Sequence, residues 1–167
     1  MANYAQVRTD LMSGTTNPAD LVSVKYQVSG VDTPIENGNV VVVGGLVDGS
    51  TNVFVGSTPT AKSGLDSLIL IASPEVIYDT GSYKTYADFR NEAGEIARGY
   101  RLRKGNCFSA TMEAFGGRAK LADVVVGDVV ELQAGTKLKI VAASTTDSTK
   151  VGEVIAKEDD MVVVRVG

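Results

Sequence analysis

Short apolar runs separated by turn residues are the feature that most constrains the fold of this chain. Residues 21–28, LVSVKYQV, alternate apolar and polar positions, which is the period of a strand with one buried face. Similar runs recur to the C-terminus, and turn sequences such as Asn37-Gly38 and Asp48-Gly49 separate them. The 167 residues include 18 glycines, which suit many tight turns. We therefore expect a mainly β protein.

The spacing of these runs divides the chain into three parts. Residues 1–20 show no steady period and end in the turn sequence TTNPAD, so we expect an extended N-terminal arm. Residues 21–95 form a β-rich region that ends in an aromatic loop. Residues 96–167 contain closely spaced short strands, which predict a small β-barrel or sandwich as a C-terminal lobe. Whether 21–95 and 96–167 form one domain or two stays open.

The loop at 81–95 interrupts the β pattern with a short helical or irregular insert. It contains three of the chain's ten aromatic residues, Tyr83, Tyr86 and Phe89, at a spacing of three that fits one or two helical turns. Large rings in an irregular segment are typical of a loop that packs against another surface.

The chain has no histidine, and this absence argues against most enzymatic sites. Ser-His-Asp and Cys-His arrangements are impossible, and the commonest general base is missing. The single cysteine, Cys107, has no histidine to activate it. The acidic run 158–160 lacks the spacing of a calcium loop and is interpreted as a solvated hairpin tip. We predict a non-enzymatic protein without cofactor or metal; carboxylates contributed by distant strands remain the open alternative.

Positive charge gathers between residues 90 and 104. Its arginines stand near aromatic residues, a pattern also found in single-strand binders built on small barrels. Glu92 and Glu95 offset much of this charge, and the net charge of −4 disfavours general nucleic-acid binding. Arginine is also a common anchor of protein interfaces, while a solvated strand face is the competing interpretation. The predicted partner-contacting or lobe-packing residues are Tyr83, Tyr86, Phe89, Arg98, Arg101 and Arg103.

Neither end of the chain nor its interior predicts a membrane partner. Residues 1–14 contain no apolar segment of the kind that a secretory signal needs. The longest apolar stretch, 40–47, is far shorter than a membrane span. We expect synthesis in a cytoplasm.

Three segments, 73–79, 88–106 and 151–158, resemble capsid decoration, or head-stabilising, proteins of tailed bacteriophages. The specific part is the phrase F-x-N-E-A-G-E-x-A-R-x-Y-x-L-x-K-G, which this chain matches from Phe89 to Gly105. The first twenty residues match poorly. The resemblance implies a structural protein made in the host bacterial cytoplasm and bound to the outer surface of the capsid. It implies the major capsid protein and further copies of the chain as partners, and neither nucleic acid nor membrane.

Two other functions stay open at this point. Another virion component, such as a tail-tube or fibre-base protein, would share the composition and the β pattern. A single-stranded nucleic-acid-binding barrel would share the basic and aromatic residues of 90–104, although the neighbouring carboxylates disfavour it.

Overall fold

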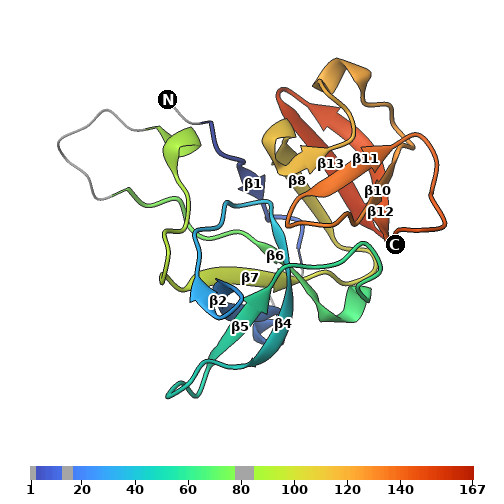
Figure 1. The fold of residues 1–167 in the computed structure, drawn as a ribbon. Coiled ribbons are helices and arrows are strands. Elements are labelled where there is room, and N and C mark those ends of the chain that lie inside the picture. The colour runs from blue at the N-terminus through green and yellow to red at the C-terminus, as the bar shows by residue number, and fades with distance from the viewer. Residues whose placement is uncertain (1–2, 13–16, 78–84) are drawn as a thin grey trace.

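The computed structural model describes residues 3–12, 17–77 and 85–167, and it is built from two β-sheets (Figure 1). The first sheet contains β2 (Leu21–Val28), β3 (Val31–Asp32), β4 (Val40–Leu46), β5 (Val53–Ser57), β6 (Leu68–Ile71) and β7 (Ala97–Arg101). The second contains β1 (Val7–Arg8), β8 (Cys107–Thr111), β9 (Phe115–Gly116), β10 (Val129–Glu131), β11 (Leu138–Val141), β12 (Lys150–Glu158) and β13 (Met161–Val166). The prediction of a mainly β fold is confirmed.

Helical structure is confined to single 3₁₀ turns in the parts of the chain that the structure describes. They are η2 (Pro18–Asp20), η3 (Leu65–Ser67), η4 (Tyr86–Asp88), η5 (Met112–Ala114) and η6 (Leu121–Asp123). The turn η4 falls within the segment where one or two helical turns were expected. None of the helices in these ranges is long and apolar enough to cross a membrane.

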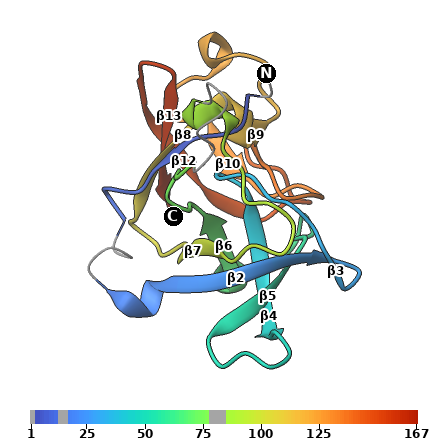
Figure 2. The ribbon, with the colours of Figure 1, turned by 90° about the vertical axis from the view of Figure 1, so that its left-hand side faces the viewer.

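The first sheet closes into a five-stranded barrel. Its strand order is β2-β5-β4-β6-β7, and β7 pairs back with β2 from Leu21↔Tyr100 to Val24↔Ala97. The pair β2–β5 is parallel and the other neighbours in the ring are antiparallel. Figure 2 shows β2 lying between β7 and β5. Closure leaves no free edge along these strands, apart from the short β3 added at the end of β2.

Small and β-branched side chains fill the barrel, and two glycines make room for them. The buried residues of this core are Val22, Val24, Tyr26, Ile35, Val41, Ile69, Ile71 and Ala97. A Cβ at Gly56 would lie 2.5 Å from Val24 Cγ1, and a Cβ at Gly99 would lie 2.6 Å from Ile69 Cδ1. Both distances are too short for non-bonded carbon atoms. A ring of five strands is therefore narrow enough to require glycine at two inward positions.

The second sheet packs on the outside of the barrel, and the two sheets share a core. Its strand order is β1-β8-β13-β12-β10-β11-β9. Because side chains alternate along β6, Leu68 and Leu70 face this shared core while Ile69 and Ile71 face the barrel interior. Both sides of β6 are buried, which explains the uninterrupted apolar run LILI.

The chain divides between the sheets after β7. This strand lies in the range 96–167 expected to form the C-terminal lobe, but its strand pairs are with β2 and β6 of the barrel. The closed barrel is thus formed by residues 21–101. Residues 107–166, together with β1, form the second sheet, and no pairing between its outer strands β1 and β9 is found among the described residues.

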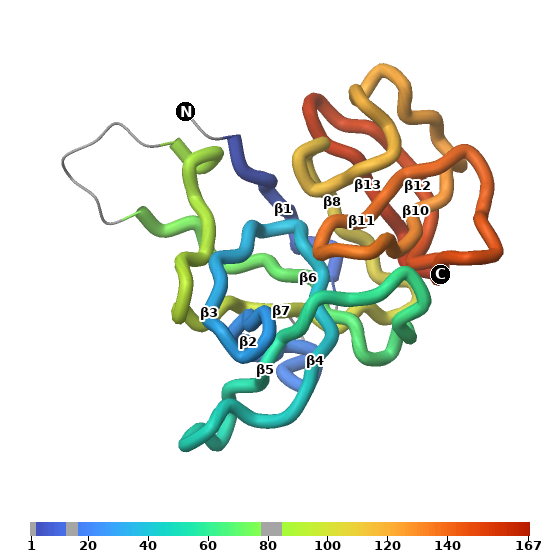
Figure 3. Tube along the Cα trace, viewed as in Figure 1, coloured from blue at the N-terminus to red at the C-terminus, as the bar shows by residue number. Residues whose placement is uncertain are grey.

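The N-terminal arm is part of the second sheet along its described portion, 3–12. Val7 pairs with Ala110 and Arg8 with Ser109, which makes β1 an outer strand next to β8. Ala5 and Met12 are buried in the shared core. The Tyr4 N–H donates to Ala87 O over 2.7 Å, so the arm also contacts the segment around η4 (Figure 3). These contacts hold the arm against its own chain.

Candidate functional site

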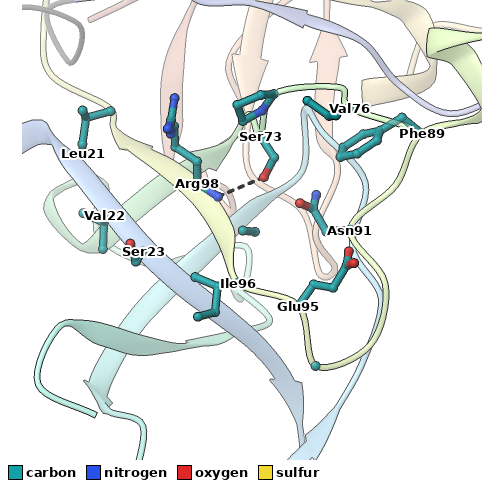
Figure 4. A pocket seen from close by; sticks show the side chains of 13 residues that line it. Leu21, Val22, Ser23, Ser73, Val76, Phe89, Asn91, Glu95, Ile96 and Arg98 are labelled. Carbon is teal, nitrogen blue, oxygen red and sulfur yellow. Dashed lines mark hydrogen bonds between the residues drawn. The ribbon is translucent and has the colours of Figure 1, made fainter. Parts of the chain in front are cut away.

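An open cleft lies on the outside of the barrel beside β7. It has a volume of about 810 Å³ and is formed by residues 21–23 of β2, by 73–76, and by 89–98 (Figure 4). Binding pockets for small ligands and side chains typically measure about 300–1,000 Å³. Exposed side chains surround the cleft, which suits a partner that lies across it more than a ligand that is enclosed by it.

Two buried asparagines hold the walls of the cleft in place. The Asn37 Nδ2 donates to Ser73 O over 3.0 Å, and the Ser73 N–H donates back to Asn37 Oδ1 over 2.9 Å. The Asn91 Nδ2 donates to Ile35 O over 3.0 Å, and the main chains of Asn91 and Ile35 form two further bonds of 2.9 Å. The segments 73–76 and 89–91 are both fixed in this way to residues 35–37.

A tight turn at 91–95 forms the end of the cleft. The Glu92 N–H donates to Glu95 Oε2 over 2.7 Å, and the Glu95 N–H donates to Glu92 O over 3.1 Å. Gly94 has a φ of +86°, which side chains other than glycine adopt at a cost. Arg90 donates to both carboxylate oxygens of Glu92. The residues NEAGE of the phage-like phrase therefore have a structural role in this turn.

Arg98 belongs to the same phrase and Ile96 stands at one of its unspecified positions, but their side chains have no comparable role in the fold. The Arg98 N–H donates to Ser73 Oγ over 2.9 Å, and Arg98 O accepts from the Ala72 N–H over 2.9 Å. Its guanidinium, however, has no hydrogen bond or ion pair with any described residue. Figure 4 shows the side chains of Arg98 and Ile96 pointing toward different ends of the cleft.

Exposed apolar side chains line the same cleft as the arginine. The exposed fractions are 59% for Ile96, 51% for Val76 and 38% for Leu21. Phe89 lines the same cleft and is half-buried. An uncommitted guanidinium among exposed apolar groups has the composition of a protein-docking site, because arginine and apolar anchors provide much of the energy of protein interfaces.

The structure separates the predicted contact residues into two groups. Phe89 and Arg98 line the cleft, and Tyr86, which is 67% exposed, lies with Glu75 and Val76 at a smaller hollow next to it. Tyr83 lies outside the described residues.

Arg101 and Arg103 line a different hollow, together with Leu65 and Asp66. Arg103 also donates to the buried carboxylate of Asp20. The alternation of a strand explains the division, because Arg98 shares a face of β7 with Tyr100 while Arg101 lies on the other.

Sequence reasoning missed the apolar residues of the cleft, although a signal was present. Leu21 occupies the face of β2 that otherwise carries Ser23, Lys25 and Gln27. Ile96 directly precedes β7, on the face that carries Arg98. An apolar side chain on a polar strand face is a marker of a contact surface that could have been read from period two. Val76 follows Pro74 in an irregular segment and gives no such signal.

One carboxylate near the cleft is destabilised by its surroundings. Burial raises the pKa of Glu75, and a 3.5 Å hydrogen bond from Asn37 Nδ2 only partly opposes this effect. Across the ranges described, no group of three or more Cys, Asp or Glu side chains is arranged to hold a metal ion. The cleft therefore offers apolar contact, the positive charge of Arg98 and the negative charge of Glu95.

Two buried acidic side chains in or next to β10, Glu131 and Asp128, are paired within the fold. Burial alone would raise the pKa of Glu131, but hydrogen bonds from Thr145, Ser144 and Lys139 outweigh it, and the pKa lies below its ordinary value. The pKa of Asp128 is also lowered: burial opposes the shift, but two hydrogen bonds from Arg118 and one from the Val125 N–H prevail. These groups stabilise the second sheet.

Comparison of the sequence with protein-family models, with curated proteins and with solved structures finds no match.

Proposed function

We propose that this chain is a non-enzymatic virion protein that binds the outer surface of a tailed-phage capsid and reinforces contacts between major capsid protein subunits. One observation carries the proposal. The segment 89–105 that carries the phage-like phrase supplies a wall of the cleft. The guanidinium of Arg98, a residue that the phrase specifies, has no hydrogen bond or ion pair with any described residue, and Ile96, at an unspecified position of the phrase, is exposed. Side chains of this kind at a cleft favour a role in contacting a partner.

A protein of this size can stabilise a capsid by mass action. A ligand that binds only the assembled shell contributes roughly RT ln(1 + [L]/Kd) for each site. An interface of about 1,600 Å² or less is enough for specific binding, and many copies on one shell add their contributions. The closed barrel is a suitable carrier for such a surface, because its five ring strands have both edges paired with each other.

The cleft is poorly suited to single-stranded nucleic acid. Binding of that kind depends on several cations that follow the phosphate backbone. The cleft contains one uncommitted cation, Arg98, whereas Arg101 and Arg103 line a separate hollow. Docking to protein is therefore the function that the geometry favours.

The test uses heads of a phage that encodes this chain, produced without the protein and then supplied with the purified protein. Heads are heated, and release of DNA is followed with a fluorescent dye. We expect release at a higher temperature when the protein is bound. Equal release temperatures with and without saturating protein would refute the reinforcing role. Labelling confined to the tail of intact particles would refute the capsid location and favour a tail component.

A further inference from the structure

We propose that the cleft binds an extended peptide segment that places a carboxylate on Arg98 and apolar side chains against Val76 and Phe89 on one side of the cleft and Ile96 on the other. The inference rests on the proposed function for the identity of the partner, which would be a segment of the major capsid protein. The chemistry of the segment follows from the cleft itself.

The charge of the partner follows from which polar groups of the cleft are already in use. Ser73 Oγ accepts from the Arg98 N–H, the Asn91 side chain donates to Ile35 O, and Glu95 Oε2 accepts from the Glu92 N–H. The Arg98 guanidinium is the charged group of the lining that has no partner among the described residues. A partner that complements the guanidinium of Arg98 therefore presents an anionic group there, and carboxylate is the anion that proteins supply for paired hydrogen bonds with arginine.

The main chain of Arg98 is held in position before a partner binds. Its N–H and its carbonyl oxygen are both hydrogen-bonded to the segment 72–73, and Asn37 fixes that segment in turn. The backbone of Arg98 therefore has little freedom to lose when a carboxylate binds. Preorganisation of this kind raises affinity without additional contacts.

The apolar part of the partner follows from the exposed side chains. Ile96 and Val76 are more than half exposed, and Phe89 lines the same cleft beside Val76 (Figure 4). Enclosed small-molecule sites bury about 70–90% of the surface of their ligand. The exposed side chains of this cleft cannot enclose a ligand to that extent. A peptide lying across the cleft would cover them with side chains while its main chain stays partly in solvent.

The test is a selection of peptides from a random, phage-displayed 12-residue library on the purified full chain. Three baits are used: wild type, Arg98→Glu and Lys150→Glu. Lys150 is exposed, lies at the start of β12 and does not line the cleft, so its variant controls for the change in overall charge. Thermal unfolding of the three proteins verifies that each is folded.

We expect wild type and Lys150→Glu to select peptides with Asp or Glu next to a large apolar residue. These peptides should bind Arg98→Glu at least about tenfold more weakly, as expected for the loss of an interfacial arginine–carboxylate pair. Arg98→Glu should instead select Lys or Arg at the same position. Ile96→Ser should weaken binding of the wild-type peptides while leaving their carboxylate requirement unchanged.

Several results would overturn the inference. They are apolar peptides without a carboxylate, peptides that bind Arg98→Glu as tightly as wild type, and a library that yields no cleft-binding peptide. Self-association that Arg98→Glu abolishes would assign the cleft to a second copy of the chain and overturn it too. The proposed function is tested separately, because heads that bind wild type and Arg98→Glu equally would retain the capsid role and reject this partner. If the cleft selects acidic peptides but the protein does not bind heads, the peptide-binding cleft would be retained and the capsid role rejected.

Discussion

Replacing Asn37 with alanine should release the wall of the cleft formed by residues 73–76. Asn37 is 1% exposed, and its side chain makes two hydrogen bonds to the main chain of Ser73. Neither the N–H nor the carbonyl oxygen of Ser73 has another main-chain partner among the described residues. Alanine would leave both groups without a protein partner.

The expected loss of stability follows from these two bonds. Each intramolecular hydrogen bond contributes about 0.5–1.5 kcal/mol net, and a buried group left unsatisfied costs about 1–3 kcal/mol. Ser73 is half-buried, so water can replace part of what is lost. We therefore expect the free energy of unfolding to fall by about 2–3 kcal/mol.

Urea unfolding followed by circular dichroism measures this change. With an m value of about 2 kcal/mol per M, the midpoint should fall by about 1 M while m stays constant. Hydrogen exchange at the Ser73 amide should accelerate more than exchange at amides of the barrel strands. Asn52→Ala, at an exposed asparagine between β4 and β5, serves as the control and should change the unfolding free energy by less than about 0.5 kcal/mol. A change of that small size for Asn37→Ala, with Ser73 exchange unaltered, would refute the role assigned to this side chain.

Three further predictions concern the core and the buried charges. Gly56→Ala should destabilise the protein by about 1–3 kcal/mol in urea unfolding, because the new Cβ would collide with Val24 Cγ1. The double variant with Val24→Ala should therefore lose less stability than the sum of the two single changes, and strict additivity would contradict this packing. The lowered pKa of Glu131 means that its carboxylate contributes stability above the ordinary pKa of 4.5, lost as the pH falls through the lower folded value. Glu131→Gln should therefore be less stable than wild type at pH 7, with a difference that shrinks in acid; a difference independent of pH would contradict it. Burial raises the pKa of Glu75, so its carboxylate destabilises the folded protein at pH 7, and Glu75→Gln should be more stable than wild type there. This advantage should be lost as the pH falls below the raised pKa of the folded protein, and lower stability of the variant at pH 7 would count against the assignment.

Local patterns predicted most of the strands in this protein. The alternation of LVSVKYQV gives β2 its buried face, with Val22, Val24 and Tyr26 inside the barrel, and the run at 40–43 becomes the first part of β4. Both patterns depend on neighbouring residues alone, so period two is sufficient to find them.

The closure of the barrel could not be predicted in the same way. It depends on β2 pairing with β7, about seventy residues later, and on β2 running parallel to β5. From the sequence alone, a glycine at position 56 or 99 would be expected to weaken a strand. Only the narrow interior of the closed barrel explains why glycine is required at both positions. Likewise, the arm has no period of its own because β1 contributes two residues to the edge of a sheet.

The contact role of the predicted site residues stays a prediction. Aromatic residues and arginines around 83–103 suggested a contact region, and Phe89 and Arg98 both line one cleft. Arg103 is instead engaged by Asp20, a residue 83 positions earlier that no local pattern connects to it. Most of the phage-like phrase is explained by the turn at 91–95 and by the buried side chains of Tyr100 and Leu102. Within the phrase, exposed side chains without a structural role, such as that of Arg98, are therefore the candidates for contact with a partner.

A map of the protein in place on phage particles would test the central proposal most directly. We predict density for the barrel on the outer surface of the capsid, with the cleft facing the major capsid protein and with Ile96 and Arg98 losing their exposure to solvent. Density on the tail would contradict the account. Binding to the capsid through another face, with the cleft still open to solvent, would contradict the site.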